Sequence, residues 1–396
     1  MSKIAFFCIP AHGHTNPTLG VVKELVERGN EVRYYSYNNL REKIEETGAE
    51  FISCDEYDHE QNLQPGDGAR IAKDLVFATS VLVETTLALG EAVEEQMDEW
   101  KPDCIVGDSM AVWAKAIAMK RNIPFISSTT TFAFNKSSAK YMREGGKGLM
   151  SMLFSMPKIG KQIKRLQKNG YPINSILDII QNDNDTDTIV YTSPEFQPFS
   201  DTFSDKYEFV GTSIRSVKEP FEKKKEKLVY ISMGTVNNDM VPFYRACIGA
   251  FKDGEYQVVI SVGNMVDISV FEELPQNIEI YKNVDQIAVL EKADAFLTHC
   301  GMNSTSESMY FKVPVLMYPQ TNEQKAVAAR IQELGAGIRL EQEDPQNIKN
   351  AVERLLNDEE YRKNASVISD SFKQCSGVKG AADKIEKTCA ERCCKK

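Results

Sequence analysis

Two histidines and a distant aspartate are the first residues in the sequence that could perform acid–base chemistry. His12 and His14 lie in the segment Pro10–Pro17 (PAHGHTNP), directly after an apolar run that predicts a strand. Asp108 follows another predicted strand, Cys104–Gly107. Because the first and fourth strands are neighbours in the common doubly wound order, Asp108 can reach a histidine of the first loop. A histidine oriented by a carboxylate can act as a general base near neutral pH.

The same residues also have a purely structural interpretation. Asp108 precedes a predicted helix that starts near Met110, and an aspartate at that place often caps a helix N-terminus. The two histidines would then only satisfy carbonyl groups of their loop. Residue types and spacing leave the base and the cap open as alternatives.

A second group of polar residues follows the predicted strand Ala295–Thr298. The chain then opens a helix at about Asn303, whose N–H groups and positive dipole end favour a phosphate or diphosphate. His299 and Ser304 add side-chain donors, and Glu307 can accept hydrogen bonds from a ribose diol one turn later. An ordinary helix cap has the same residue types, so this anion site is also one of two interpretations.

Two further strand ends carry small or polar groups that could approach the same ligand. Ser232–Thr235 (SMGT) contains a glycine, and Pro319–Gln324 (PQTNEQ) contains amides and a carboxylate. Each signal is weak alone. Their placement at strand ends is nevertheless where open parallel sheets bind ligands.

The elements that must position these groups alternate between strands and helices in both halves of the chain. A helix over Thr18–Arg28 has apolar residues on one face, and Gly29 follows it at a position that favours a left-handed residue. The expected strands of the first half are Ile4–Pro10, Glu31–Ser36, Glu50–Cys54, Cys104–Gly107 and Phe125–Ser128. Those of the second half are Leu228–Ser232, Gln257–Ser261, Ile278–Tyr281, Ala295–Thr298 and Val315–Tyr318.

The chain has 396 residues, which favours two domains, and a charged stretch between the two halves predicts the linker. We expect a first domain over 1–215, a linker over 216–227 and a second domain over 228–377. Residues 378–396 predict a C-terminal helix whose packing partner the sequence does not specify. The Met-rich segment between Phe134 and Asn182 interrupts the regular alternation, and it suits either core packing or an adaptable apolar binding surface.

Composition limits the partners and the compartment. A net charge of −10 disfavours nucleic acid and anionic membranes, and no apolar run approaches the roughly 18 residues that span a bilayer. The N-terminus does not resemble a signal peptide. Nine scattered cysteines form no C-x₂-C pair, so a reducing cytoplasm is expected, with Cys389, Cys393 and Cys394 in a frayed helix end. We expect no resident metal and no stable membrane insertion.

These motifs, in this order and in two tandem halves, resemble the family 1 UDP-glycosyltransferases of the GT-B fold, particularly the bacterial macrolide glycosyltransferase subgroup. The similarity covers nearly the whole chain. It is strongest over Val284–Gln324, where THCGMNST, the following Glu307, and a final Glu-Gln pair stand in register, and it includes HGHTNP and the GDS at Gly107–Ser109. The resemblance implies an α/β fold with two Rossmann-like, doubly wound parallel-sheet domains facing a cleft.

The resemblance also implies the reaction. His14 would be the general base, Asp108 would orient it, and a hexose, expected to be glucose, would pass with inversion from a UDP-sugar to a small hydrophobic acceptor such as a macrolide, phenolic or sterol-like compound. No metal or other cofactor is implied, and the protein is expected to be a monomer or weak dimer. The residues expected to contact the donor are Ser232, Gly234, Thr235, Val284, Gln286, His299, Gly301, Asn303, Ser304, Glu307, Glu323 and Gln324. The residues expected to contact the acceptor are His12, Asn16, Phe132, Phe134, Met150 and Phe154.

Two positions depart from the family pattern. Most members have a tryptophan that stacks on the base where this chain has Asn283, and many have Asp-Gln where it has Glu323-Gln324. The lost stacking is worth on the order of 1–3 kcal/mol. We therefore expect changed nucleotide affinity or base choice at the first position and a changed sugar preference at the second.

The same architecture serves two other functions. One is a non-catalytic accessory protein that binds sugar nucleotides, and the other is a non-hydrolysing sugar-nucleotide epimerase. His14 and Asp108 favour an enzyme over an accessory protein. The HGHTNP segment and the Glu323-Gln324 pair favour transfer over epimerisation.

Overall fold

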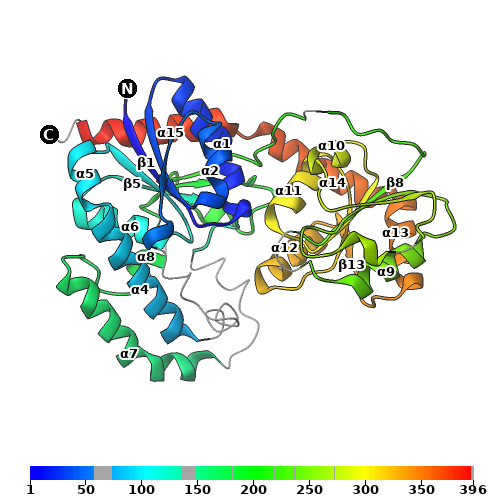
Figure 1. The fold of residues 1–396 in the computed structure, drawn as a ribbon, viewed down its shortest axis with the longest axis horizontal. Coiled ribbons are helices and arrows are strands. Elements are labelled where there is room, and N and C mark those ends of the chain that lie inside the picture. Colours follow the sequence, from blue (N-terminus) through cyan, green and yellow to red (C-terminus); the bar gives the residue numbers. More distant parts are fainter. Residues whose placement is uncertain are drawn as a thin grey trace. The chain divides into compact units, whose positions relative to one another are not determined.

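The structure is a computed structural model that describes residues 1–57, 74–135, 148–180, 182, 184–217, 219–234, 238–271 and 273–393. The chain divides into two compact units (Figure 1). The first comprises Met1–Tyr191, Phe199–Ser213 and Ser376–Lys396, and the second comprises Thr192–Pro198 and Ile214–Cys375. Each unit is an α/β structure built on a parallel sheet.

The first unit contains a seven-stranded sheet of order β3-β2-β1-β4-β5-β6-β7. Its strands are β1 (Lys3–Phe7), β2 (Glu31–Ser36), β3 (Glu50–Ser53), β4 (Cys104–Asp108), β5 (Phe125–Thr129), β6 (Asp187–Val190) and β7 (Tyr207–Phe209). Strand β1 pairs in parallel with both β2 and β4, so Ile4 lies opposite Val32 on one side and Cys104 on the other. The expected neighbourhood of the first and fourth strands is confirmed.

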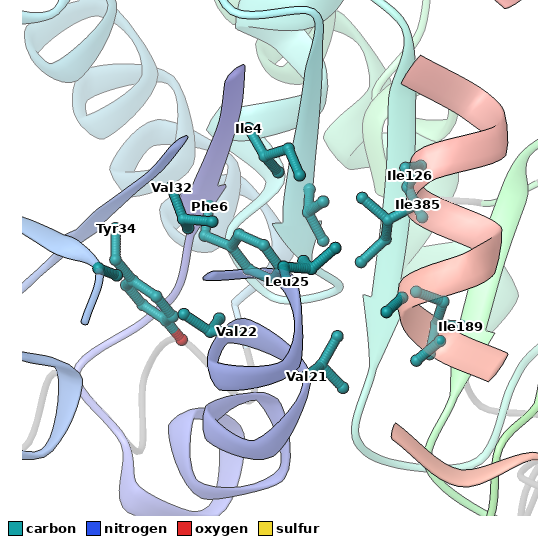
Figure 2. Packing of buried hydrophobic residues seen from close by; sticks show 14 of the residues in the cluster. Ile4, Phe6, Val21, Val22, Leu25, Val32, Tyr34, Ile126, Ile189 and Ile385 are labelled. Carbon is teal, nitrogen blue, oxygen red and sulfur yellow. The ribbon is translucent and has the colours of Figure 1, made fainter. Parts of the chain in front are cut away.

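Helices cover both faces of this sheet. They are α1 (His12–Glu27), α2 (Arg41–Glu45), α4 (Leu75–Ala92), α5 (Glu94–Trp100), α6 (Val112–Arg121), α7 (Gly148–Lys168), α8 (Leu177–Ile180) and α15 (Gly377–Cys393). Successive strand residues point to opposite faces, so Ile4 and Phe6 pack with Leu25 of α1 and Ile385 of α15 (Figure 2). Phe7 packs on the other face with residues of α4, α5 and α6.

Helix α1 begins earlier than the sequence suggests. It starts at His12 rather than Thr18, directly after the N-cap residue Ala11, and Pro17 lies inside it. Residues 12–17 of the segment expected as a loop therefore form the first turns of a helix. Pro17 lacks one N–H donor near the start of the helix, but it does not end the helix. The end is as predicted, since Gly29 has φ 86° and closes the helix through its N–H to Val26.

The second unit contains a six-stranded sheet of order β10-β9-β8-β11-β12-β13. Its strands are β8 (Leu228–Ser232), β9 (Gln257–Ser261), β10 (Ile278–Tyr281), β11 (Ala295–Thr298), β12 (Val315–Met317) and β13 (Gly337–Arg339). Its helices are α9 (Val241–Ala250), α10 (Gln286–Leu290), α11 (Met302–Tyr310), α12 (Asn322–Glu333), α13 (Pro345–Asn357) and α14 (Glu359–Gln374). Val229 and Ile231 of the central β8 pack against Phe243 of α9 and Val352 of α13.

The C-terminal helix α15 belongs to the first unit. Arg28, at the end of α1, bonds Asp383 at 2.6 Å and Glu386 at 2.9 Å. Cys389 is buried and forms a disulfide with Cys104 of β4. The expectation that Cys389 lies in a frayed end is therefore wrong, because the apolar face of α15 packs on the sheet and carries this thiol into the core.

The stretch 216–227, expected as a linker, is grouped with the second unit. Lys223 bonds Asp294 at 2.6 Å, and the Lys224 N–H donates to the Gln257 side chain at 2.6 Å.

Within the described chain no single helix has the length and hydropathy to cross a membrane, although the bent pair Val76–Ala92 and Glu94–Trp100 passes that test by length and composition.

Candidate active site

The structure brings His14 and Asp108 into direct contact. His14 lies in the first turn of α1, just after β1, and Asp108 is the last residue of the adjacent β4. The His14 Nδ1 and Asp108 Oδ2 atoms are 2.8 Å apart. The Asp108 side chain is almost fully buried, whereas the His14 side chain retains 18 % exposure. A carboxylate that accepts from Nδ1–H leaves Nε2 unprotonated, which is the form a general base needs.

Asp108 also accepts hydrogen bonds from the backbone that follows it, which is part of the capping role considered as the alternative to orienting a base. Its Oδ1 atom accepts the Met110 N–H at 2.9 Å, and its carbonyl accepts the Ala111 N–H. The residue therefore shapes the turn after β4 with one oxygen and holds His14 with the other. It is not the N-cap of the next helix, because that helix begins at Val112 with Ala111 as its N-cap.

Thr130, which sequence reasoning missed, is a third member of this cluster. It follows the end of β5, the strand next to β4, and its Oγ1 atom lies 3.0 Å from His14 Nδ1. The available signal was its position directly after a predicted strand. It stands in the run Thr129–Thr131, however, and nothing in the residue types distinguishes one threonine of that run from another.

The residues expected to contact the acceptor differ in how far their side chains are exposed. His12 and Asn16 are exposed on the first turns of α1. Partial desolvation by neighbouring atoms, together with the charge of the nearby Lys43, lowers the pKa of His12. Phe132 is buried, whereas Phe134 is 40 % exposed. Met150 and Phe154 fall within α7, but their side chains lie outside the described part of the structure.

We expect Asp108→Asn to reduce turnover about 10²- to 10⁴-fold with little loss of stability. The asparagine oxygen can still accept the Met110 N–H, but its amide then donates to His14 Nδ1 and places the ring proton on Nε2. Steady-state kinetics and thermal unfolding measure the two effects. A fully active variant would mean that Asp108 only shapes the turn.

In the second unit, His299 is enclosed by glycines. It follows β11, and α11 begins at Met302 after the N-cap residue Gly301. A Cβ atom added to Gly234 would lie 2.6 Å from the His299 ring, and one added to Gly301 would lie 2.5 Å from Nε2. Gly234 also has φ 80°, which favours glycine. Both glycines are thus required for the ring to occupy this place.

Burial sets the charge of His299. It lowers the pKa of the imidazole to about 4, against a smaller opposite effect of the Ser232 backbone. The ring is therefore neutral at pH 7, and its buried Nδ1 has no hydrogen-bond partner among the described residues. A buried polar atom of this kind calls for a partner, and the adjacent N-terminus of α11 favours an anion. Asn303 and Ser304 lie in the first turn of the same helix.

Glu307 of α11 is linked to Gln286 at the start of α10. The Gln286 Nε2 atom donates to Glu307 Oε2 at 2.6 Å and to Ser304 Oγ at 3.2 Å, and Tyr230 OH donates to Gln286 Oε1 at 3.3 Å. These contacts join three of the predicted donor-binding residues. Burial raises the pKa of Glu307 to about 7, although the bond from Gln286 and the charge of Arg215 oppose the shift.

If Glu307 binds the ribose hydroxyls, affinity for a nucleoside diphosphate should increase as the pH rises from 6 to 8. The protonated form dominates below a pKa of about 7, and only the carboxylate accepts from both hydroxyls. Titration calorimetry with UDP at several pH values measures the effect. Glu307→Gln should remove this part of the pH dependence while keeping the contribution from the phosphate itself. An unchanged profile would contradict the role of Glu307.

The remaining predicted donor residues differ in their surroundings. Gln324 belongs to the capping box of α12, where its Oε1 accepts the N–H groups of Gln320 and Thr321, and Glu323 lies in the same first turn. Ser232 is buried at the end of β8 and Val284 is half-buried. Thr235 lies outside the described residues. Among the residues that are described, no group of His, Cys, Asp or Glu could hold a metal ion.

Asn283, at the position where the resemblance implies a stacking tryptophan, forms a polar contact. Its Nδ2 atom donates to Asn264 Oδ1 at 2.8 Å on the surface. The two side chains offer amide groups rather than an aromatic face. Next to it, Asp285 caps α10 and holds Arg215 through two bonds of 2.6 and 2.8 Å.

The chain is similar to known proteins over nearly its whole length. Residues 247–376 match the family model of the erythromycin biosynthesis protein CIII-like C-terminal domain. The chain is 33 % identical to the NDP-glycosyltransferase YjiC of Bacillus licheniformis, over 97 % of this chain and 96 % of that protein. It is 27 % identical to the demethyllactenocin mycarosyltransferase of Streptomyces fradiae, over 98 % of this chain and 86 % of that protein.

The fold has equally extensive counterparts. The crystal structure of the glycotransferase of kitacinnamycin superposes with a TM-score of 0.84 at 26 % identity, covering 98 % of each chain. Sequence similarity over the full length and the shared two-sheet architecture lead to the same assignment. The chain therefore belongs to the family 1 glycosyltransferases of the GT-B fold, in the bacterial macrolide glycosyltransferase subgroup, and it is an enzyme of the kind that uses nucleoside diphosphate sugars.

Proposed function

We propose that the protein transfers a hexose from a UDP-sugar to a hydroxyl group of a small hydrophobic acceptor, with inversion at the anomeric carbon. The observation that carries this proposal is the 2.8 Å contact between His14 Nδ1 and Asp108 Oδ2. It gives the partly exposed imidazole the tautomer of a base, as an acceptor hydroxyl requires. An accessory protein would need Asp108 only for the turn after β4 and would not need a histidine held in this tautomer.

The proposed mechanism is a single displacement. His14 Nε2 takes the proton of the acceptor hydroxyl as the acceptor oxygen bonds to the anomeric carbon. The bond from that carbon to the diphosphate oxygen breaks in the same step, and UDP leaves with the electron pair. The N–H groups at the start of α11 and the His299 ring stabilise the charge of the leaving diphosphate. We propose that these groups make a divalent cation unnecessary for transfer.

Glu307 supports a ribonucleoside such as uridine over a deoxyribonucleoside. Gln286 and Glu307 form a buried polar pair that suits a ribose, because a ribose offers two adjacent hydroxyl groups and a deoxyribose only one. A site built to bind both hydroxyls discriminates against the analogue that lacks one. We therefore propose a preference for UDP over dTDP that Glu307→Gln should reduce. Glucose is proposed as the sugar.

Exposed apolar side chains in the segments that follow β4 and β5 support a hydrophobic acceptor. Met110 is 59 % exposed and Phe134 is 40 % exposed. They follow β4 and β5, the two strands whose ends also carry Asp108 and Thr130. Such a surface suits a macrolide, phenolic or sterol-like compound with a free hydroxyl group, in keeping with the subgroup to which the chain belongs.

A donor and acceptor screen tests the proposal. UDP release and product mass are measured with UDP-glucose over phenolic, macrolide and sterol acceptors, and UDP-galactose, UDP-N-acetylglucosamine and dTDP-glucose serve as alternative donors. Proton NMR of the product reports the anomeric configuration, and a chelator tests the need for a metal. Transfer that gives the inverted product supports the proposal. Conversion of a UDP-sugar without any acceptor would indicate an epimerase, and binding without turnover an accessory protein.

A further inference from the structure

Two oxygen atoms, not one, lie within hydrogen-bond distance of His14 Nδ1. Asp108 Oδ2 is at 2.8 Å and Thr130 Oγ1 is at 3.0 Å. A neutral imidazole nitrogen carries at most one proton, so the two contacts share a single N–H group or compete for a lone pair. Which of these applies decides which ring nitrogen carries the single N–H proton of the neutral imidazole and whether Nε2 is free to act as a base.

The contacts of Asp108 decide between the two arrangements. Its other oxygen accepts the Met110 N–H at 2.9 Å, and an ionised carboxylate can only accept. With Asp108 as an acceptor at the shorter distance, the proton resides on Nδ1. The Thr130 hydroxyl then cannot donate to the same nitrogen, and its oxygen faces the N–H as a second acceptor.

Because Thr130 and Asp108 are buried, the contact from Thr130 Oγ1 can restrict the orientation of the His14 ring. Thr130 is 2 % exposed and Asp108 is 3 % exposed, so bulk water has little access to either contact. A single acceptor fixes the distance to the ring but allows the imidazole to pivot about that bond. Two acceptors that extend from adjacent strands, β4 and β5, restrict this pivot and fix the ring plane.

We propose that Thr130 is a positioning residue for His14. Its Oγ1 atom is the second acceptor of the Nδ1–H group and, with Asp108, holds the imidazole so that Nε2 faces the acceptor hydroxyl. This inference rests on the proposed function for its effect on turnover. The contact itself can be tested without any substrate.

The test compares Thr130→Val, which keeps the side-chain shape but lacks the hydroxyl, with Thr130→Ser, which keeps the hydroxyl. Thr129→Val is the matched control, because Thr129 is the preceding residue, is 5 % exposed, and pairs with Ser127 rather than with His14. Thermal unfolding shows whether each variant folds. If valine is not tolerated, Thr130→Ala and Thr130→Ser form the comparison.

The first readout is NMR of protein labelled with ¹³C and ¹⁵N in histidine. The chain has only four histidines, so substitution of each one assigns the signals. The ¹⁵N shifts of His14 report which nitrogen is protonated. We expect Thr130→Val to lower the midpoint of the His14 titration by about 0.5 pH unit, because the imidazolium loses an acceptor that it uses more strongly than the neutral ring does. Thr130→Ser should restore the midpoint.

The second readout is kinetic. We expect kcat to fall about 10-fold in Thr130→Val, with KM for the donor unchanged and the acidic limb of the pH profile moved to lower pH. Thr130→Ser should retain most of the activity. An unchanged His14 titration in Thr130→Val, or a Thr130→Ser variant as impaired as Thr130→Val, would overturn the proposal. If the wild-type protein transfers no sugar but the titration still shifts, the proposed function is wrong and the Thr130–His14 contact stands.

Discussion

His14→Ala should abolish nearly all sugar transfer while leaving UDP binding intact. General-base catalysis contributes on the order of 10²- to 10⁴-fold, and alanine has no group that can take the acceptor proton. UDP affinity should not change, because the residues proposed to bind the nucleotide belong to the second unit and His14 to the first. Initial rates with UDP-glucose and calorimetric titration with UDP measure the two quantities on the same protein.

The choice of acceptor makes this prediction more specific. A nitrophenol is already largely ionised near pH 8 and needs a base less than an alcohol does, so His14→Ala should lose much less activity on the nitrophenol. Lys23→Ala is the matched control, because Lys23 lies on the same helix with a side chain that is 62 % exposed. Unaltered turnover on an alcohol in His14→Ala would contradict the assignment of the base.

Most of the fold was predictable because apolar runs mark buried strands. The ten expected strands correspond to ten observed ones, and the boundaries agree within three residues. The omitted strands are β6, β7 and β13, which have only three or four residues each and lie toward the edges of their sheets. Their sequences, DTIV, YEF and GIR, contain charged residues or glycine and do not form a continuous apolar run such as the VLM of the equally short β12.

Contacts in the candidate site were predictable where the residues directly follow adjacent strands. Contacts that depend on how a helix far along the chain packs were not predictable. The His14–Asp108 contact follows from strand adjacency, although the two residues are 94 positions apart. The disulfide between Cys104 and Cys389 spans 285 positions and depends on how α15 packs, so spacing could not predict it. Gln324 illustrates a further difficulty, because a residue assigned to the sugar by resemblance also closes a helix capping box.

Gly301→Ala should weaken UDP binding about 10- to 100-fold, which corresponds to the roughly 1–3 kcal/mol that overpacking costs. The backbone tolerates alanine here, since Gly301 has φ −62° and ψ 140°. The added Cβ would lie 2.5 Å from His299 Nε2, so the ring must move away from the start of α11. Calorimetry with UDP measures the loss. Gly160→Ala is a matched control, because a Cβ at Gly160 meets no atom within 4 Å.

A double-mutant cycle shows whether His299 transmits this effect. In a His299→Ala background the ring that the new Cβ would displace is gone, so adding Gly301→Ala should cost little more. Thermal unfolding of all four proteins separates lost binding from lost folding. If Gly301→Ala weakens UDP binding equally with and without the His299 ring, the glycine acts through the backbone at the start of α11. The inference that Gly301 affects UDP binding by leaving room for the His299 ring would then be wrong.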